Sequence, residues 1–256
     1  MTGIAQLFGI QLAPNFKRPY FSVSLGDFWR RWHISLGAWM RDYVFYPFAL
    51  TRPVSRMSKA LKKKAGTHIA RALPAALGNI LVFLLVGVWH GAQMNYVLWG
   101  LYNGVILAFT ALVEPVYKRM NDRLPRLTAS GGFHVFRILR TFLVVNIGWY
   151  FDRCVRVSDA FAMLHKTFFA FNAQQLFDGT LDTLGLAAKD YRILLVATIL
   201  LFVVSLMQER GVKIRDFVLS RPLALRWAVL YAFIFFVLAT FGGSNVAASG
   251  FMYAVF

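Results

Sequence analysis

Five long apolar runs constrain the fold of this chain more than any other feature. They run from about 73 to 89, 96 to 113, 133 to 151, 191 to 207 and 223 to 241. Each is near the roughly 17–25 residues that a helix needs to cross a hydrocarbon core of about 30 Å. Hydrophobic residues make up 58% of the chain, against about 45–50% in soluble domains. We therefore predict an all-α, polytopic transmembrane helical protein with a multi-pass topology.

The segments between these runs alternate in charge. The segment 51–71 carries seven basic residues and no acid, and 118–126 and 208–226 are also basic. The segment 91–95 is uncharged, and 152–190 is balanced. Because positive charge favours cytoplasmic loops, the basic segments are expected inside and the others, with 242–256, outside. The net charge of +17 then predicts contact with membrane lipid and no nucleic-acid partner.

The region 20–50 is rich in aromatic residues but is interrupted by charge. From 25 to 43 large apolar residues recur at spacings of three or four, which predicts an amphipathic helix that is interfacial or re-entrant. Ser24 is expected to cap its start, with Asp27 in the first turn and Arg31 as the ion-pair partner of Asp27. The apolar stripe consists of Trp29, Trp32, Leu36, Trp39 and Tyr43.

Two histidines are candidates for chemistry. His90 ends the first apolar run between Gly87 and Gly91. Ionisable residues at membrane depth are costly and point to function, and a neutral imidazole can accept a proton near pH 7. The alternative is an interfacial histidine bonded to a backbone carbonyl. His33 lies on the polar face of the predicted helix, where the alternative is a solvated surface.

Other kinds of site find no support in the sequence. The one cysteine, Cys154, cannot form a disulfide within the chain. No two histidines have the spacing of a metal site, and no nucleophile elbow or phosphate-binding glycine loop is present. We therefore predict no metal and no bound cofactor.

Six segments carry extended motifs: Asn15–Tyr20, Asp27–Leu36, Trp39–Tyr43, Trp89–Ala92, Tyr96–Gly104 and Gly250–Phe256. Together they closely resemble the membrane-bound O-acyltransferases. The nearest branch is the bacterial one with alginate O-acetyltransferases and teichoic-acid D-alanyltransferases. The resemblance implies an acyltransferase of the bacterial inner (cytoplasmic) membrane with a funnel through the bilayer. It would move an acetyl or D-alanyl group to a hydroxyl of an exported polysaccharide, cell-wall polymer or partner protein.

The resemblance also implies roles for particular residues and partners. His90 matches the catalytic histidine of the family, and His33 matches a second site residue. The acyl donor would be acyl-CoA or an acyl carrier protein thioester on the cytoplasmic side, and an exported acyltransferase is a further expected partner. The predicted substrate-binding residues are Arg30, Trp32, Arg41, Trp89 and Asn95.

Two departures from the family pattern leave other interpretations open. Family members are longer, and the motif at Asn15 follows earlier spans in them, so 1–256 is interpreted as one partial membrane domain, the C-terminal half. Asn103 also stands where many relatives carry histidine. The alternatives are an inactive truncated remnant that binds partners and a fragment of a membrane transporter.

Overall fold

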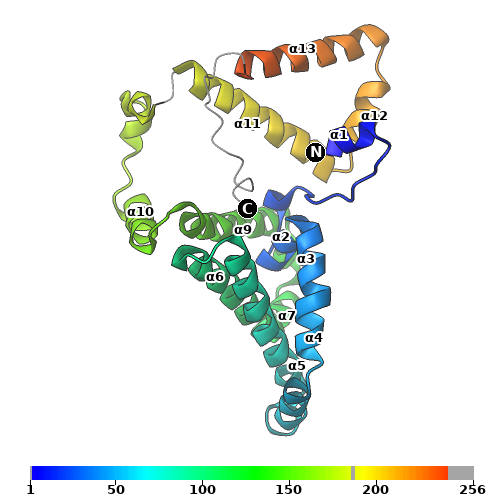
Figure 1. The fold of residues 1–256 in the computed structure, drawn as a ribbon, viewed down its shortest axis with the longest axis vertical. Coiled ribbons are helices and arrows are strands. Elements are labelled where there is room, and N and C mark those ends of the chain that lie inside the picture. The colour runs from blue at the N-terminus through cyan, green and yellow to red at the C-terminus, as the bar shows by residue number, and fades with distance from the viewer. Residues whose placement is uncertain (1, 186–187, 242–256) are drawn as a thin grey trace. The chain divides into compact units, whose positions relative to one another are not determined.

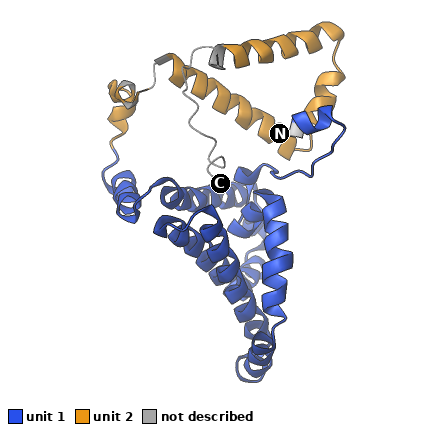
Figure 2. Ribbon diagram, in the orientation of Figure 1, with its two compact units in different colours: residues 1–171 blue, residues 172–256 orange. Residues whose placement is uncertain are grey.

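The computed structural model describes residues 2–185 and 188–241, which form helices and no strands (Figure 1). The prediction of an all-α fold is confirmed. The chain divides into two compact units, 1–171 and 172–256 (Figure 2). The expectation of one partial domain over 1–256 stays a prediction, and the motif at Gly250–Phe256 and the outward placement of 242–256 lie outside the described residues.

The first unit contains the candidate site. Its helices are α1 (Thr2–Leu7), η1 (Pro19–Phe21), α2 (Leu25–Arg31), α3 (Ile34–Met40), the π-helical η2 (Arg41–Phe45), α4 (Tyr46–Ala49), α5 (Arg52–His90), α6 (Met94–Leu112), α7 (Glu114–Arg123), α8 (Pro125–Thr128), α9 (Gly131–Arg153) and α10 (Val157–Phe169). The second unit contains η3 (Ala173–Leu176), η4 (Thr180–Leu184), α11 (Ala188–Glu209), α12 (Ile214–Leu219) and α13 (Leu223–Phe241).

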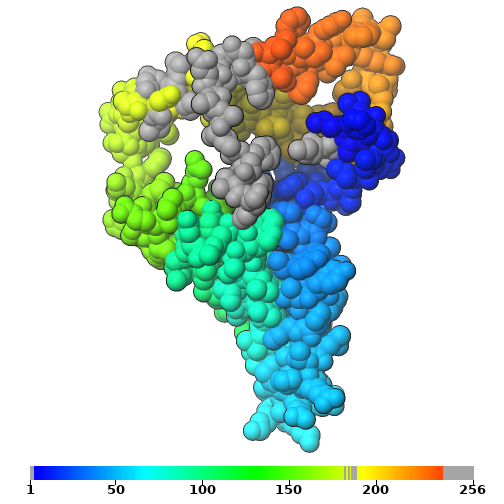
Figure 3. Space-filling model, viewed as in Figure 1, coloured from blue at the N-terminus to red at the C-terminus, as the bar shows by residue number. Residues whose placement is uncertain are grey.

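The helix α5 is two helices that meet at Gly66. Gly66 has φ 85°, a left-handed value that glycine adopts without a steric cost. The basic part, 52–65, folds back on the apolar part, 67–90, and the Ser58 hydroxyl donates to the Ala70 carbonyl at 2.7 Å. In Figure 3 this hairpin forms the cyan tip of the first unit. The predicted span 73–89 lies within the apolar part, which is long enough, at about 36 Å, to cross a bilayer.

Glycines bring α5 and α6 into backbone contact. A Cβ placed on Gly100 would meet the carbonyl oxygen of Phe83, and one on Gly87 would meet the carbonyl oxygen of Tyr96. A Cβ on Gly104 would lie 2.9 Å from the Cα of Ile80. Small residues at the interface are how membrane helices approach closely. These glycines therefore fix the distance between the two helices.

The helix α9 packs on α6 through polar contacts between side chains and backbone. The Asn95 amide donates to the Phe151 carbonyl at 3.2 Å, and the Tyr102 hydroxyl donates to the Val144 carbonyl at 2.8 Å. The ring of Tyr102 also lies against Gly148, where an added Cβ would be 3.3 Å from it. The three helices α5, α6 and α9 are thus joined in chain order.

Among the residues that the structure describes, three helices are long and apolar enough to cross a membrane: α5, α6 and the Lys189–Glu209 part of α11. The apolar run in α13, Leu223–Leu238, is shorter. The predicted span 133–151 forms α9 but is not among the three, and it carries Arg137 and Arg140. The predictions of helices at 96–113, 191–207 and 223–241 agree with α6, α11 and α13. The five-pass topology itself stays a prediction.

The expected continuous helix from 25 to 43 is wrong. It breaks after Arg31, where His33 has φ 49° and ψ 53°. The segment 15–17 supplies the reason, since the Lys17 amide donates to the Arg31 carbonyl at 2.8 Å and the Ile34 amide to the Asn15 carbonyl at 3.0 Å. These bonds replace helical bonds at the break.

The break also divides the predicted apolar stripe. Trp29 and Trp32 pack into the first unit, where Trp29 lies 5.7 Å from Trp99 and Trp32 lies 5.5 Å from Trp149, measured between ring centroids. Trp39 and Tyr43 lie against each other at 5.4 Å and are 52% and 68% exposed. Leu36 also packs against a buried cluster of the first unit, so the stripe faces the core from Trp29 to Leu36 and is exposed at Trp39 and Tyr43.

Candidate active site

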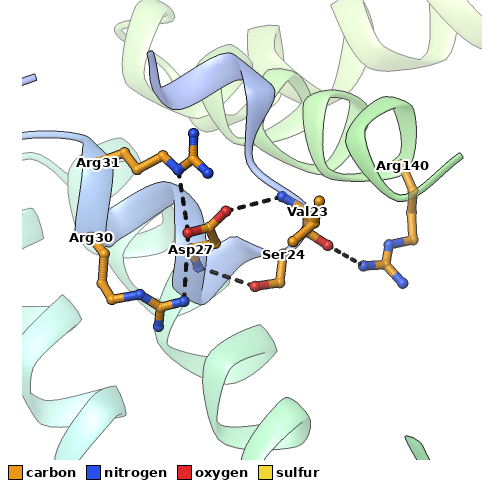
Figure 4. A network of polar contacts seen from close by, with 6 residues as sticks. All are labelled: Val23, Ser24, Asp27, Arg30, Arg31 and Arg140. Carbon is orange, nitrogen blue, oxygen red and sulfur yellow. Dashed lines mark hydrogen bonds and ion pairs between the residues drawn. The ribbon is translucent and has the colours of Figure 1, made fainter. Parts of the chain in front are cut away.

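A polar network holds the start of α2, the helix that leads to His33 (Figure 4). The Ser24 hydroxyl oxygen accepts from the Asp27 amide at 3.1 Å, which confirms the predicted cap. The Asp27 carboxylate accepts from the Val23 amide at 3.2 Å and pairs with Arg31 at 3.3 Å, which confirms the predicted ion pair. The carboxylate in the first turn also suits the positive end of the helix.

Two longer-range bonds attach α2 to the neighbouring helices. Arg140 of α9 donates to the Val23 carbonyl at 3.0 Å (Figure 4). The Trp29 indole donates to the Asn103 side-chain oxygen of α6 at 3.2 Å. Because α2 has only seven residues, these contacts rather than its own helical bonds determine where it lies.

His33 is held in a strained position at the start of α3. Residues other than glycine rarely adopt its left-handed backbone. Asn15 stabilises it, because the Asn15 side-chain oxygen accepts from the Ser35 amide at 2.9 Å and its amide nitrogen lies 3.5 Å from His33 Nδ1. Partial burial lowers the pKa of the His33 imidazole below its ordinary value, so the ring is neutral near pH 7.

His90 ends α5 among aromatic rings. Its ring centroid lies 5.1 Å from that of the buried Trp99 and 6.1 Å from that of Tyr96. The Asp152 carboxylate interacts electrostatically with it. The flanking Gly91 makes room for the Tyr96 ring, since a Cβ there would lie 2.7 Å from it. The imidazole is therefore partly buried among aromatic rings.

Trp89 connects the two histidines. Its ring centroid lies 5.8 Å from that of His33 and 4.8 Å from that of His90. It is 43% exposed, so one part of the indole remains open beside both imidazoles. The fold thus brings together two histidines that are 57 positions apart in the sequence.

A pocket of about 490 Å³ opens beside His33, between α2, α3, η2, α5 and α6. Four predicted site residues line it: Arg30, Trp32, His33 and Arg41. Arg30 lies 3.6 Å from Asp27, and Arg41 lies 2.8 Å from Asp42. Both arginines are exposed, so these pairs are weak and leave the cations available to an anionic ligand.

The other three predicted residues do not line this pocket. Trp89 adjoins it through His33, and His90 lies on the other side of Trp89. Asn95 is only 2% exposed and binds the Phe151 carbonyl, while its own oxygen has no partner among the described residues. The structure thus places Asn95 in the junction between α6 and α9, and its contact with substrate stays a prediction.

Sequence reasoning missed the contributions of Asn15 and Trp99 and left the role of Asn103 open. Asn103 is buried, accepts from Trp29 and donates to the Trp99 carbonyl at 2.9 Å. The spacing of four between Trp99 and Asn103 places both on one face of α6 and was the available signal. Asn15 gave no such signal, because its partners are 18 and 20 positions away.

Comparison with known proteins places this geometry in context. Residues 2–147 match the model of the membrane-bound O-acyltransferase family. A probable alginate O-acetylase of Pseudomonas syringae pv. tomato is 34% identical over 175 residues, which cover 68% of this chain and 28% of that protein. A teichoic acid D-alanyltransferase of Bacillus subtilis is 32% identical over 148 residues, covering 58% of this chain and 34% of the relative.

A peptidoglycan O-acetyltransferase of Helicobacter pylori is 30% identical over 162 residues, which cover 63% of this chain and 26% of that protein. The chain therefore spans between 26% and 34% of the length of these three relatives. The matched family segment includes both histidines, Trp89 and the whole lining of the pocket beside His33.

Proposed function

The chain belongs to the membrane-bound O-acyltransferase family, and on that premise we propose that it transfers an acetyl or D-alanyl group to a hydroxyl of an exported polysaccharide, a cell-wall polymer or a partner protein. The relatives are named for O-acetylation of alginate and peptidoglycan and for D-alanylation of teichoic acid. The observation that carries the proposal is the placing of His33 and His90 on either side of Trp89. An imidazole can accept the proton of a hydroxyl, so two imidazoles beside a pocket suit acyl transfer to a hydroxyl.

His90 acts as the general base in this proposal. Its imidazole takes the proton of the acceptor hydroxyl as that oxygen attacks the carbonyl carbon of an acyl thioester. A carbon–oxygen bond forms and the carbon–sulfur bond breaks. The imidazolium then returns the proton to the departing thiolate, so no net proton is gained or lost. Asp152, which interacts with His90, stabilises the imidazolium between these steps.

His33 orients the donor or the acceptor from the adjoining pocket. It is suited to this role because its lowered pKa keeps it a neutral hydrogen-bonding group at physiological pH. Trp32 forms part of the pocket wall. Arg30 and Arg41, both exposed, attract the phosphate-bearing donor, which is acyl-CoA or an acyl carrier protein thioester.

The setting of the reaction completes the proposal. The protein lies in the bacterial inner membrane as a multi-pass protein, takes the acyl group on the cytoplasmic side and serves an acceptor outside. The basic segment 51–71 is suited to an acidic acyl carrier protein as well as to orientation in the bilayer. Where the acceptor hydroxyl belongs to a partner protein, that protein is an exported acyltransferase, which completes transfer to the polymer.

The test is acyl transfer to envelope polymer in a strain that lacks its native activity. The strain would express this chain, or the chain extended upstream to its natural gene start, each with His90 intact or changed to Ala. We expect transfer by the extended protein, and a loss of at least about 100-fold in His90→Ala. The matched control is His134→Ala, because His134 is exposed on α9 and should be dispensable.

Unchanged transfer in His90→Ala would contradict the role of His90 but not membership of the family. An extended protein that inserts normally and shows no transfer would contradict the proposed activity. Binding of partners without turnover would then favour the inactive remnant, and flux of solute without covalent change would favour the transporter.

A further inference from the structure

A second pocket, of about 370 Å³, lies between the start of α2 and the helices α6, α7 and α9. It shares a wall with the pocket beside His33. Leu25 lines the second pocket and its neighbour Gly26 lines the first. In the same way Ile106 of α6 lines the second and Leu107 the first. The two pockets are therefore back to back across α2 and α6.

The lining of this second pocket is amphipathic. Most of it is apolar, including Phe109, Phe133 and Val144, while Arg137 and Arg140 supply two positive charges. None of the described residues that line it is acidic. By contrast, a third pocket, between α5, α6 and α7, has Glu114 beside its basic residues. The second pocket therefore favours a ligand with an anionic group and an apolar part.

The two arginines are not neutralised by the protein. In the described parts of the chain, no carboxylate lies in ion-pair contact with Arg137 or Arg140. Arg140 gives one N–H to the Val23 carbonyl and keeps further donors, since a guanidinium has five. Partly buried cations beside apolar helices are costly unless an anion or a polar group compensates them.

We propose that this pocket binds an anionic phospholipid, with the phosphate at Arg137 and Arg140 and an acyl chain along the apolar lining. The basic segment 118–126 directly precedes α9 and is predicted to face the cytoplasm, where anionic lipid attracts basic segments. Free phosphate would satisfy the arginines but not the apolar lining, so the lipid is the favoured source of the phosphate. Basic pockets between membrane helices are suited to such headgroups.

The bound lipid has a structural consequence for the candidate site. It contacts the wall that contains Leu25 and Ile106, and α2 continues from this wall to Trp29 and ends before His33. The lipid therefore supports α2 from the side opposite the pocket beside His33. This inference does not depend on the proposed acyl transfer, because it concerns binding alone.

The test measures lipid binding to the purified full chain in detergent by native mass spectrometry. The probes are dioleoyl phosphatidylglycerol, dioleoyl phosphatidylcholine and inorganic phosphate. The variant is Arg137→Gln, which leaves the bond from Arg140 to Val23 in place. The matched control is Arg123→Gln, an exposed basic residue at the end of α7.

We expect phosphatidylglycerol to bind more tightly than phosphatidylcholine and to bind about tenfold more weakly to Arg137→Gln, since a hydrogen bond to a charged group is lost. Arg123→Gln should bind like the wild type. Equal binding of both lipids, or equal weakening by Arg123→Gln, would overturn the proposal. Displacement of the lipid by millimolar phosphate would overturn it in favour of a free-anion site.

A second variant keeps the test valid if Arg137→Gln does not fold. Asn121 lines the same pocket and is exposed, so Asn121→Trp should obstruct it without removing a charge. Weaker phosphatidylglycerol binding with an unchanged unfolding midpoint supports the pocket, whereas unchanged binding overturns it.

Discussion

The helices α6 and α11 are both long and apolar, but they differ in how they pack. The mean hydropathy of the most apolar window is 1.2 in α6 and 2.0 in α11, yet 33% of the α6 window is buried and none of the α11 window. In α6, Gly100 and Gly104 lie at the contact with α5, and the buried Asn95 lies at the contact with α9. The sequence of α11 contains neither residue type.

The comparison shows that apolarity and packing are separate properties in this protein. Lipid tails are as apolar as leucine, so hydrophobic surface alone does not drive two membrane helices together. Close backbone approach and hydrogen bonds across helices do so. We therefore assign the stability of the first unit to its glycine and polar contacts.

The largest expected effect follows from adding one methyl group between α5 and α6. In Gly100→Ala the new Cβ would meet the Phe83 carbonyl oxygen, and the helices would have to separate at a cost of about 2 kcal/mol. Thermal unfolding in detergent would measure it. Gly132→Ala is the matched control, because open space surrounds Gly132 on α9. Equal stability of the two variants would contradict the role of glycine packing.

A smaller loss of unfolding free energy is expected when the hydrogen bond between α2 and α6 is removed. Trp29→Phe and Asn103→Ala each remove one partner of the indole–amide bond. A double-mutant cycle should give a coupling of about 0.6–1.7 kcal/mol, as for other hydrogen bonds between membrane helices. The unfolding free energies of the four proteins provide the measurement. A coupling of zero would mean that the bond does not fix α2.

The third test concerns the pH dependence of the first unit. Burial lowers the pKa of folded His33 from about 6.5, so the unfolded chain binds more protons just below that pH. Stability should therefore fall as pH decreases from about 6.5 towards the folded pKa. His33→Asn should remove this part of the dependence, because asparagine tolerates the left-handed backbone. The same change in the control His134→Asn would show that His33 is not the source.

The smallest effect is expected in α11. Leu195 is 61% exposed, so Leu195→Ala should change the unfolding free energy by less than about 0.5 kcal/mol. In contrast, Val145→Ala on α9, where Val145 is 5% exposed, should cost about 1.5 kcal/mol, because the smaller side chain leaves a cavity between packed helices. A large loss in Leu195→Ala would mean that α11 packs against another segment in the membrane.

Local signals predicted local structure well. The long apolar runs placed α6 and the apolar part of α5, and the spacing from Ser24 to Asp27 predicted the start of α2. The break at His33 was missed because Asn15, 18 positions earlier, supplies the competing bonds, and no helical period contains such a partner.

The candidate site was predicted in composition but not in arrangement. The motifs named His33 and His90, but only the contact of His33 with the end of α5 shows that Trp89 lies between them. The second pocket could not be predicted, because its two arginines look like ordinary flanking charges until α9 meets the start of α2. Pairing between distant elements is thus what the sequence does not reveal.

The bend at Gly66 determines the direction in which the basic helix 52–65 presents its side chains. Successive residues of a helix turn by about 100°. Inserting one residue between 67 and 70 would therefore rotate the helix 52–65 around the axis of the span and separate Ser58 from the Ala70 carbonyl. The number of positive charges would be the same, but Lys62, Lys63 and Lys64 would point in another direction. The direction in which the lysine side chains point, as well as their number, therefore determines which molecules this hairpin can contact.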